Sequence, residues 1–424
     1  MTHMWSCRSA WGRKDWESHR VIRVAEKGST MTAASDAAPR AAGNARGNAA
    51  GWRDWAVGVL RDDRRASPVT PLLRFPLPSE WGIDLYLKDE SVHPTGSLKH
   101  RLARSLLMQG LVDGAIAEGT TLVEASSGST AVSEAYFARE LGLPFVAVMP
   151  AATSARKIDL IESYGARCVF VDRAADMVPT ARDLAHSLDG FFVDQFSFAS
   201  TVSDWMGETG IAAEILAQLE GVRHPVPDWF VVGVGTGGTS SSLSRYCRSR
   251  QIASRVAIVD PQGSAYFDTW CQGDGPAAYT GSRIEGIGRP TAELSFIPDL
   301  VDQAMRVPDA LSIACLHLLH STAGIFAGGS TGTNLAGAFR LIADMRAAGR
   351  TGSIVTLVCD AGERYTDSYY DRSWLDSRDI RPDDYLSELQ SFLATGLWPT
   401  LENGVVCAEH RGVVVPTLGI SSQH

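Results

Sequence analysis

The sequence predicts an α/β protein in which helices cover both faces of parallel β-sheets. Two patterns predict this fold: short apolar segments alternate with longer helix-like segments, and turns rich in glycine and hydroxyl side chains connect them. The chain has 424 residues. At about 100–200 residues per domain, this length favours two or three domains.

The alternation begins near Trp52 and continues through most of the chain. In the first half, strands are predicted at 121–125, 144–150 and 168–171, and helices at 130–142, 154–164 and 178–188. In the second half, strands are predicted at 228–234, 255–260 and 353–359, and helices at 311–320, at 332–348 and in a segment that ends at Arg250. Because a helix follows nearly every strand, neighbouring strands are expected to be parallel.

The two ends of the chain lack this rhythm. Residues 1–50 are predicted to be a disordered extension, because residues 32–50 are mostly small or polar and show no apolar period. An N-terminal α/β domain is expected over 51–195 and a C-terminal α/β domain over 196–398. Residues 399–424 are expected to form a tail.

Composition excludes several classes of function. The net charge is -9, so the chain offers no broad basic surface for nucleic acid. No apolar run reaches the roughly 18–20 residues that a membrane span needs. The seven cysteines are scattered without a CxxC pair, which favours reduced thiols in a cytoplasmic protein over disulfides or a metal site.

A glycine-rich turn after the strand at 228–234 predicts an anion site. Residues 235–240 read GTGGTS and open a helix, where backbone N–H groups and hydroxyls can bind a phosphate. A second interpretation stays open, since Gly233, Gly235 and Gly238 also fit GxGxxG and Asp260 ends the next strand. That pattern is typical of dinucleotide binding in oxidoreductases.

Two further turns, each at the start of a predicted helix, resemble the glycine-rich turn at 235–240. Residues 124–130 read EASSGST, and four hydroxyls at a helix N-terminus suit a carboxylate. Residues 328–334 read GGSTGTN and predict another anion nest or a flat-ring contact. In both turns, simple helix capping by Ser or Thr is the alternative.

Lys99 follows a Pro/Gly/Ser turn and begins a predicted helix. The positive end of the helix dipole favours a neutral amine, which is the form that condenses with a carbonyl to an imine. A solvated surface charge is the alternative for any single lysine. Together, a phosphate loop, a carboxylate loop and this lysine indicate pyridoxal-phosphate chemistry on an amino acid.

These motifs resemble the cysteine-synthase-like, fold-type-II pyridoxal-phosphate enzymes across about residues 51–398. The matching features occur in family order: TPL at 70–72, GSLKHR at 96–101, SSGST at 126–130, QF at 195–196 followed by TG and EI at 209–215, GTGGT at 235–239, EGIG at 285–288 and GGSTGT at 328–333. The resemblance implies two doubly wound parallel-sheet domains with the active site between them, as in the tryptophan synthase β-like fold. It also implies a homodimer.

The resemblance assigns a role to each candidate residue. It implies that Lys99 holds pyridoxal 5'-phosphate and is the catalytic base. The other cofactor contacts are expected from Ser129, Gly235, Thr236, Gly237, Gly238, Thr239 and Ser330, with Ser330 at the ring nitrogen. Substrate contacts are expected from Ser126, Ser127, Gly128, Thr130, Gln195 and Gly286.

Within this family, the segments around Lys99, SSGST and EGIG are most similar to L-cysteine desulfhydrases. Ser129 replaces the asparagine that the wider family places beside the cofactor's ring oxygen. The expected reaction is therefore β-elimination on L-cysteine through an aminoacrylate, giving sulfide, pyruvate and ammonia. A cysteine synthase or related β-replacement enzyme is the alternative, and a nicotinamide-dependent oxidoreductase is a distant one.

Overall fold

Two β-sheets organise the computed structural model, which describes residues 49–273, 279–399, 404–410 and 413–415. The smaller sheet has the strand order β5-β4-β3-β6, and all of its strands are parallel. Its strands are β3 (Leu122–Ala125), β4 (Phe145–Pro150), β5 (Arg167–Val171) and β6 (Phe191–Phe192). Each of β3, β4 and β5 coincides with a predicted strand to within two residues.

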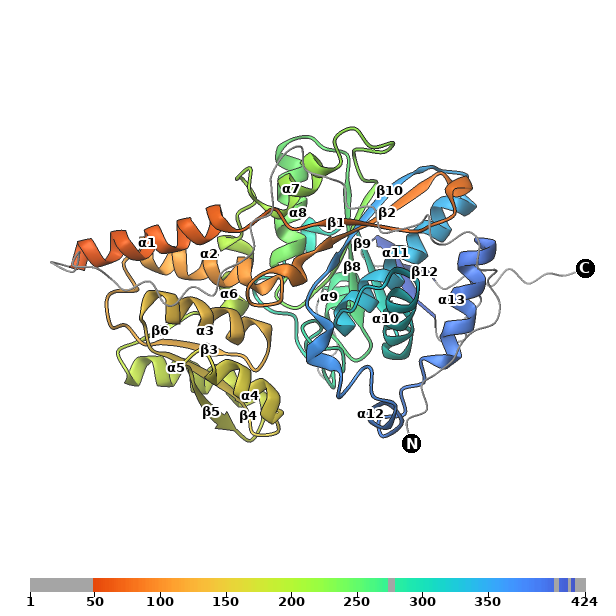
Figure 1. The fold of residues 1–424 in the computed structure, drawn as a ribbon. Coiled ribbons are helices and arrows are strands. Elements are labelled where there is room, and N and C mark those ends of the chain that lie inside the picture. Colours follow the sequence, from red (N-terminus) through yellow and green to blue (C-terminus); the bar gives the residue numbers. More distant parts are fainter. Residues whose placement is uncertain (1–48, 274–278, 400–403, 411–412, 416–424) are drawn as a thin grey trace, which may run out of the picture.

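Helices cover both faces of the smaller sheet (Figure 1). They are α1 (Ala49–Ala66), α2 (Lys99–Val112), α3 (Ser129–Leu141), α4 (Ala155–Glu162) and α5 (Met177–Ser187). Successive strand residues point to opposite faces. Leu122 and Phe145 therefore join a core with α1, α2 and α3, whereas Val123 and Val146 pack against α5.

The larger sheet has the strand order β1-β2-β10-β7-β8-β9-β11-β12. Its strands are β1 (Leu72–Phe75), β2 (Ile83–Asp89), β7 (Trp229–Gly233), β8 (Arg255–Pro261), β9 (Gln303–Val307), β10 (Gly352–Val358), β11 (Val406–His410) and β12 (Val413–Val415). The five strands from β2 to β9 are parallel, while β1, β11 and β12 pair antiparallel at the two edges.

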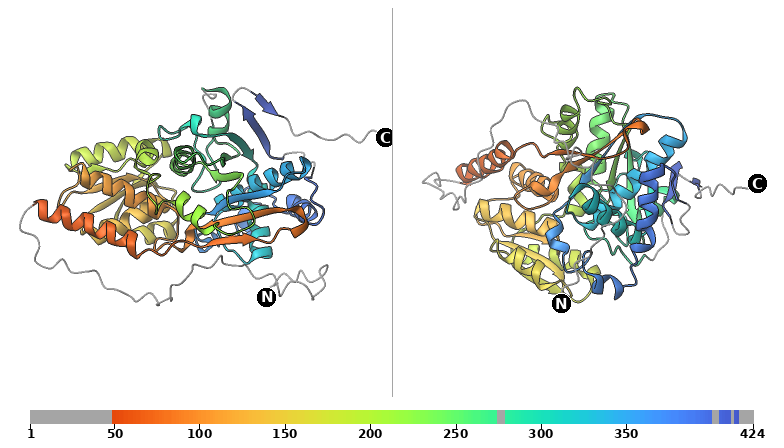
Figure 2. Two further views of the ribbon diagram at one scale, coloured as in Figure 1. Left: turned by 90° about the horizontal axis from the view of Figure 1, so that it is seen from above. Right: turned by 45° about the vertical axis from the view of Figure 1, so that its right-hand side comes forward.

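Helices also lie on both faces of the larger sheet (Figure 2). They are α6 (Gln195–Val202), α7 (Ile211–Gln218), α8 (Gly238–Ser249), α9 (Tyr266–Gln272), α10 (Asp309–Ala323), α11 (Gly329–Ala347), α12 (Arg372–Asp376) and α13 (Asp383–Thr395). Residues of α10, α11 and α13 bury one face, and residues of α7 and α8 bury the other. The predicted α/β class with parallel sheets is confirmed.

Two parts of the chain join the larger sheet although they lie outside the predicted C-terminal domain, residues 196–398. β1 and β2 belong to the larger sheet, where β2 pairs with β10, although both lie within the N-terminal segment 51–195. In the segment 399–424, β11 pairs with β9. Residues 1–48 of the predicted disordered extension lie outside the described residues. Among the helices of the described ranges, none is long and apolar enough to cross a membrane.

Candidate active site

Lys99 is fixed at the first position of α2 by contacts with the end of β10. Ser97 forms an isolated antiparallel bridge with Asp360, and the Leu98 N–H donates to the Cys359 carbonyl at 2.9 Å. The preceding turn requires a left-handed residue, which Gly96 supplies with φ +68°. A lysine from one predicted domain is thereby docked against the larger sheet.

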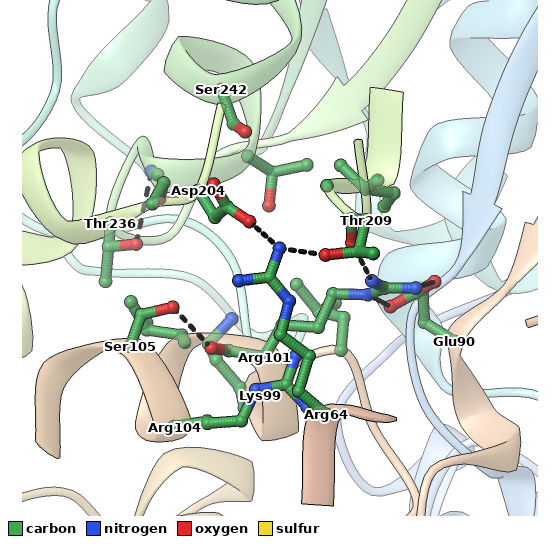
Figure 3. Close-up of a pocket in the computed structure, with 17 residues that line it drawn as sticks. Arg64, Glu90, Lys99, Arg101, Arg104, Ser105, Asp204, Thr209, Thr236 and Ser242 are labelled. Carbon is green, nitrogen blue, oxygen red and sulfur yellow. Dashed lines mark hydrogen bonds and ion pairs between the residues drawn. The ribbon is translucent and has the colours of Figure 1, made fainter. Parts of the chain in front are cut away.

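The environment of Lys99 favours an uncharged amine. Burial lowers its pKa from the ordinary 10.5, and the nearby Cys359 and Asp360 only partly oppose this. Lys99 lines a pocket, which Figure 3 shows between α2 on one side and Thr236 and Ser242 on the other. A neutral amine facing a pocket is the arrangement that covalent attachment of a carbonyl cofactor requires.

The GTGGT turn between β7 and α8 forms a tight cradle. A Cβ on Gly235 would lie 2.5 Å from the Gly286 carbonyl oxygen, and one on Gly237, at φ +85°, would lie 2.8 Å from the Phe296 Cα. Thr236, Gly238 and Thr239 line the same pocket as Lys99. Because α8 begins here without a side-chain cap, its N-terminus suits a phosphate. The turn therefore fits the phosphate of the predicted cofactor.

We expect Gly235→Ala to weaken cofactor binding by about tenfold or more, because its Cβ would push against backbone rather than a flexible side chain. Titration of cofactor-free protein with pyridoxal 5'-phosphate, followed by absorbance, measures this. The matched control is Gly58→Ala in α1, where the Cβ meets nothing within 4 Å. Equal affinity of the two variants would contradict the assignment of the cradle.

The SSGST turn joins β3 to α3 and carries the predicted substrate contacts. Ser126 accepts a hydrogen bond from the Gly128 N–H, which shapes the turn, and Gly128 precedes α3 without a side-chain cap. Thr130 donates to the Gln195 Oε1 at 2.7 Å. The structure therefore brings two predicted substrate residues, 65 positions apart, into direct contact at a helix N-terminus.

Arg364 reaches this turn from the larger sheet and is a residue that the sequence analysis missed. Its guanidinium donates to the Ser129 Oγ at 2.7 Å and to the Thr95 carbonyl oxygen. Arg364 follows β10, so its position at the carboxyl end of a parallel strand was an available signal. A cation therefore lies beside the position where the wider family has an asparagine.

The EGIG turn and the GGSTGT turn complete the ring of loops. Gly288 donates its N–H to the Val234 carbonyl at 2.7 Å, which ties the EGIG turn, with Gly286, to the phosphate cradle. Glu285 pairs with Lys157 of α4 at 2.7 Å, a contact between elements of the two sheets. Ser330 is buried near the start of α11, and Thr331 accepts from the Cys359 N–H. The ligand roles that the resemblance assigns to Lys99 and to the residues of these turns, Ser127 and Ser330 among them, remain predictions.

Asp260, the acid that the GxGxxG interpretation needs, is buried and binds the protein's own backbone. Its Oδ2 accepts a hydrogen bond from the Phe267 N–H at 2.8 Å, near the start of α9, and its side chain is buried. Burial raises its pKa to about 7. The acidic contact to a ribose that the GxGxxG interpretation needs is therefore not supplied by this residue. Within the described ranges, no group of three or more His, Cys, Asp or Glu is placed to hold a metal ion.

Comparisons with known proteins agree with this geometry. Residues 64–360 match the family described as pyridoxal-phosphate dependent enzyme. An L-cysteine desulfhydrase of Mycobacterium tuberculosis is 50% identical over 352 residues, covering 82% of this chain and 96% of the relative. A cysteine synthase of Dictyostelium discoideum is 30% identical over 335 residues, covering 74% of this chain and 85% of the relative.

A solved structure is also similar. It is a hydrogen sulfide-producing enzyme in complex with an alpha-aminoacrylate intermediate. The TM-score is 0.65 at 26% identity, and the match covers 74% of this chain and 92% of that one.

Proposed function

This chain belongs to the family of pyridoxal-phosphate dependent enzymes, and we propose that it is a carbon–sulfur lyase that converts L-cysteine to sulfide, pyruvate and ammonia. The similarity to the mycobacterial L-cysteine desulfhydrase carries this proposal, because it extends over nearly the whole of that relative. Three features of the site support it: Lys99 with its lowered pKa, the GTGGT turn that fits a phosphate, and the SSGST turn that suits a carboxylate.

The residues around the site divide the work of β-elimination. The cofactor, when bound, supplies an electron sink that stabilises negative charge at the substrate α-carbon. The N-terminus of α3 binds the substrate carboxylate, which orients the α-hydrogen. Lys99 would hold the cofactor at rest, and its Nζ would accept the α-proton of the substrate. The sulfur leaves with its bonding electrons, and water completes the conversion to pyruvate and ammonia.

The neutral Ser330 and the short Ser129 favour elimination over a long-lived carbanion. The resemblance places the Ser330 hydroxyl at the ring nitrogen, where it would not hold a proton as a carboxylate would, so negative charge would be better expelled with the leaving group. The alternative is β-replacement, in which O-acetylserine loses acetate from its β-carbon and sulfide then adds to that carbon to give cysteine. Both reactions use the same lysine and turns.

A side-by-side assay tests the proposal. L-cysteine alone is scored for sulfide and pyruvate, and O-acetylserine with sulfide is scored for cysteine. We expect the first rate to be the larger. If cysteine formation is faster by more than about tenfold, a difference of about 1.4 kcal/mol in barrier, the enzyme is a synthase. A cytoplasmic location and a homodimer remain our expectations from the sequence.

A further inference from the structure

Two glutamates lie buried beneath the carboxylate turn, and the proposed mechanism does not use them. Glu124 is in β3 and Glu134 is in α3, and neither side chain is exposed to solvent. Apart from Glu124, neither carboxyl oxygen of Glu134 has a hydrogen-bond partner in the described part of the chain. A buried, unsatisfied carboxyl group is costly, so this pair needs an explanation.

Glu124 connects the pair to the substrate contacts. Its Oε1 accepts the Ala125 N–H at 2.6 Å, and its Oε2 accepts the Gln195 N–H at 3.1 Å. The Gln195 side chain in turn accepts from Thr130. A continuous series of contacts therefore runs from Glu134 through Glu124 and Gln195 to the turn.

Two carboxylates in contact inside a protein do not both ionise near neutral pH, so such a pair retains one proton there. Burial raises the pKa of Glu124 to about 7, and burial together with Glu124 raises that of Glu134 well above its usual range. Glu124 accepts hydrogen bonds from two N–H groups, so it is the ionised partner. Glu134 has no such donors among the described residues and is therefore the protonated partner. Asp194 is the other carboxylate that acts on Glu124, and its charge adds to the repulsion.

We propose that Glu134 and Glu124 share one proton and act as positioning residues, with protonated Glu134 fixing the Glu124 carboxylate that holds Gln195 and, through it, Thr130 in place for the carboxylate of an amino-acid substrate. This inference rests on the proposed function only in requiring that the turn binds an amino acid. Loss of the shared proton places two like charges together and displaces Glu124 from Gln195.

The test uses L-alanine, which has no β-leaving group and so binds without elimination or replacement. Its dissociation constant for the cofactor-loaded enzyme is followed through the visible absorbance of the cofactor, at about pH 7 and about pH 9. The variants are Glu134→Leu, which removes the donor, and Glu134→Gln, which keeps a donor that cannot ionise. Glu140→Gln, at the partly exposed end of α3, is the matched control. Comparison with this variant at each pH removes the contribution that comes from titration of alanine itself.

Relative to the control, we expect Glu134→Leu to raise the dissociation constant about tenfold at both pH values. Between about pH 7 and about pH 9, the affinity of the wild type for alanine should fall more than that of Glu134→Gln, which has no shared proton to lose. If Glu134→Leu does not fold, Glu134→Gln decides. A wild-type-like pH response of Glu134→Gln, or wild-type affinity of Glu134→Leu, overturns the inference. Failure of L-cysteine turnover in the wild type overturns the proposed function instead.

Discussion

Lys99→Ala is expected to lower turnover of L-cysteine by more than about 10³-fold, because it removes both the amine that holds the cofactor and the base that accepts the α-proton. The purified variant should also lose the visible absorption band of covalently held cofactor. Absorption spectra and sulfide release from the same preparations measure both effects.

Lys157→Ala is the matched control for this variant. Lys157 belongs to α4 and pairs with Glu285 of the EGIG turn, so it lies near the site. It is not among the residues that line the pocket of Lys99. Its replacement should leave the absorption band intact and change turnover far less. A Lys99→Ala enzyme that keeps the band and turns over L-cysteine would remove this lysine from the mechanism.

Arg101→Met is expected to cost about 3–5 kcal/mol of unfolding free energy, because it leaves the buried Glu90 carboxylate without its arginine and Glu214 with Lys88 alone. Arg101 donates to both oxygens of Glu90, at 2.6 and 3.0 Å, and to both oxygens of Glu214, at 2.7 Å each. Glu90 is fully buried. Methionine keeps most of the side-chain length, so the change reports chiefly on charge and hydrogen bonding.

The loss should depend on pH with a definite sign. Burial alone would raise the pKa of Glu90, but Arg101 and His93 hold it well below the ordinary 4.5. A carboxyl with a lowered folded-state pKa stabilises the protein above its ordinary pKa and loses that contribution as the pH falls. The difference between wild type and Arg101→Met should therefore be full near neutrality and shrink in acid.

Denaturant unfolding at several pH values measures this difference. Arg173→Met is the matched control, since Arg173 forms an exposed ion pair with Asp176, and we expect it to leave the stability nearly unchanged. Equal stabilities of the two variants at neutral pH would contradict the importance of the buried network.

Much of the fold was predictable because its central strands are short, apolar and followed by helices. The strand β2 escaped prediction since it contains Asp84 and Lys88, two charges that read as surface residues. The structure buries both: Asp84 pairs with Arg74 and Arg223, and Lys88 pairs with Glu214 and donates to the Thr70 carbonyl. β11 escaped prediction for a different reason, because its five residues form a strand by pairing with the distant β9.

The candidate site was predictable where topology alone places residues. The phosphate cradle follows β7 of the larger sheet and the carboxylate turn follows β3 of the smaller one, and the carboxyl ends of such strands are where α/β proteins bind ligands. Both turns were therefore predictable from their position and local composition. Contacts between distant segments were not: Arg364 lies 235 positions from Ser129, and Glu134 reads as an ordinary surface residue of a helix. A single sequence carries no local signal for such pairings.

The most direct test of the proposed lyase is the stoichiometry of products that purified, cofactor-loaded enzyme forms from L-cysteine as sole substrate. β-Elimination followed by hydrolysis predicts equal amounts of sulfide and pyruvate, matching the L-cysteine consumed. Sulfide without pyruvate, or no consumption of L-cysteine by an enzyme that carries the visible band of its cofactor, would contradict the account.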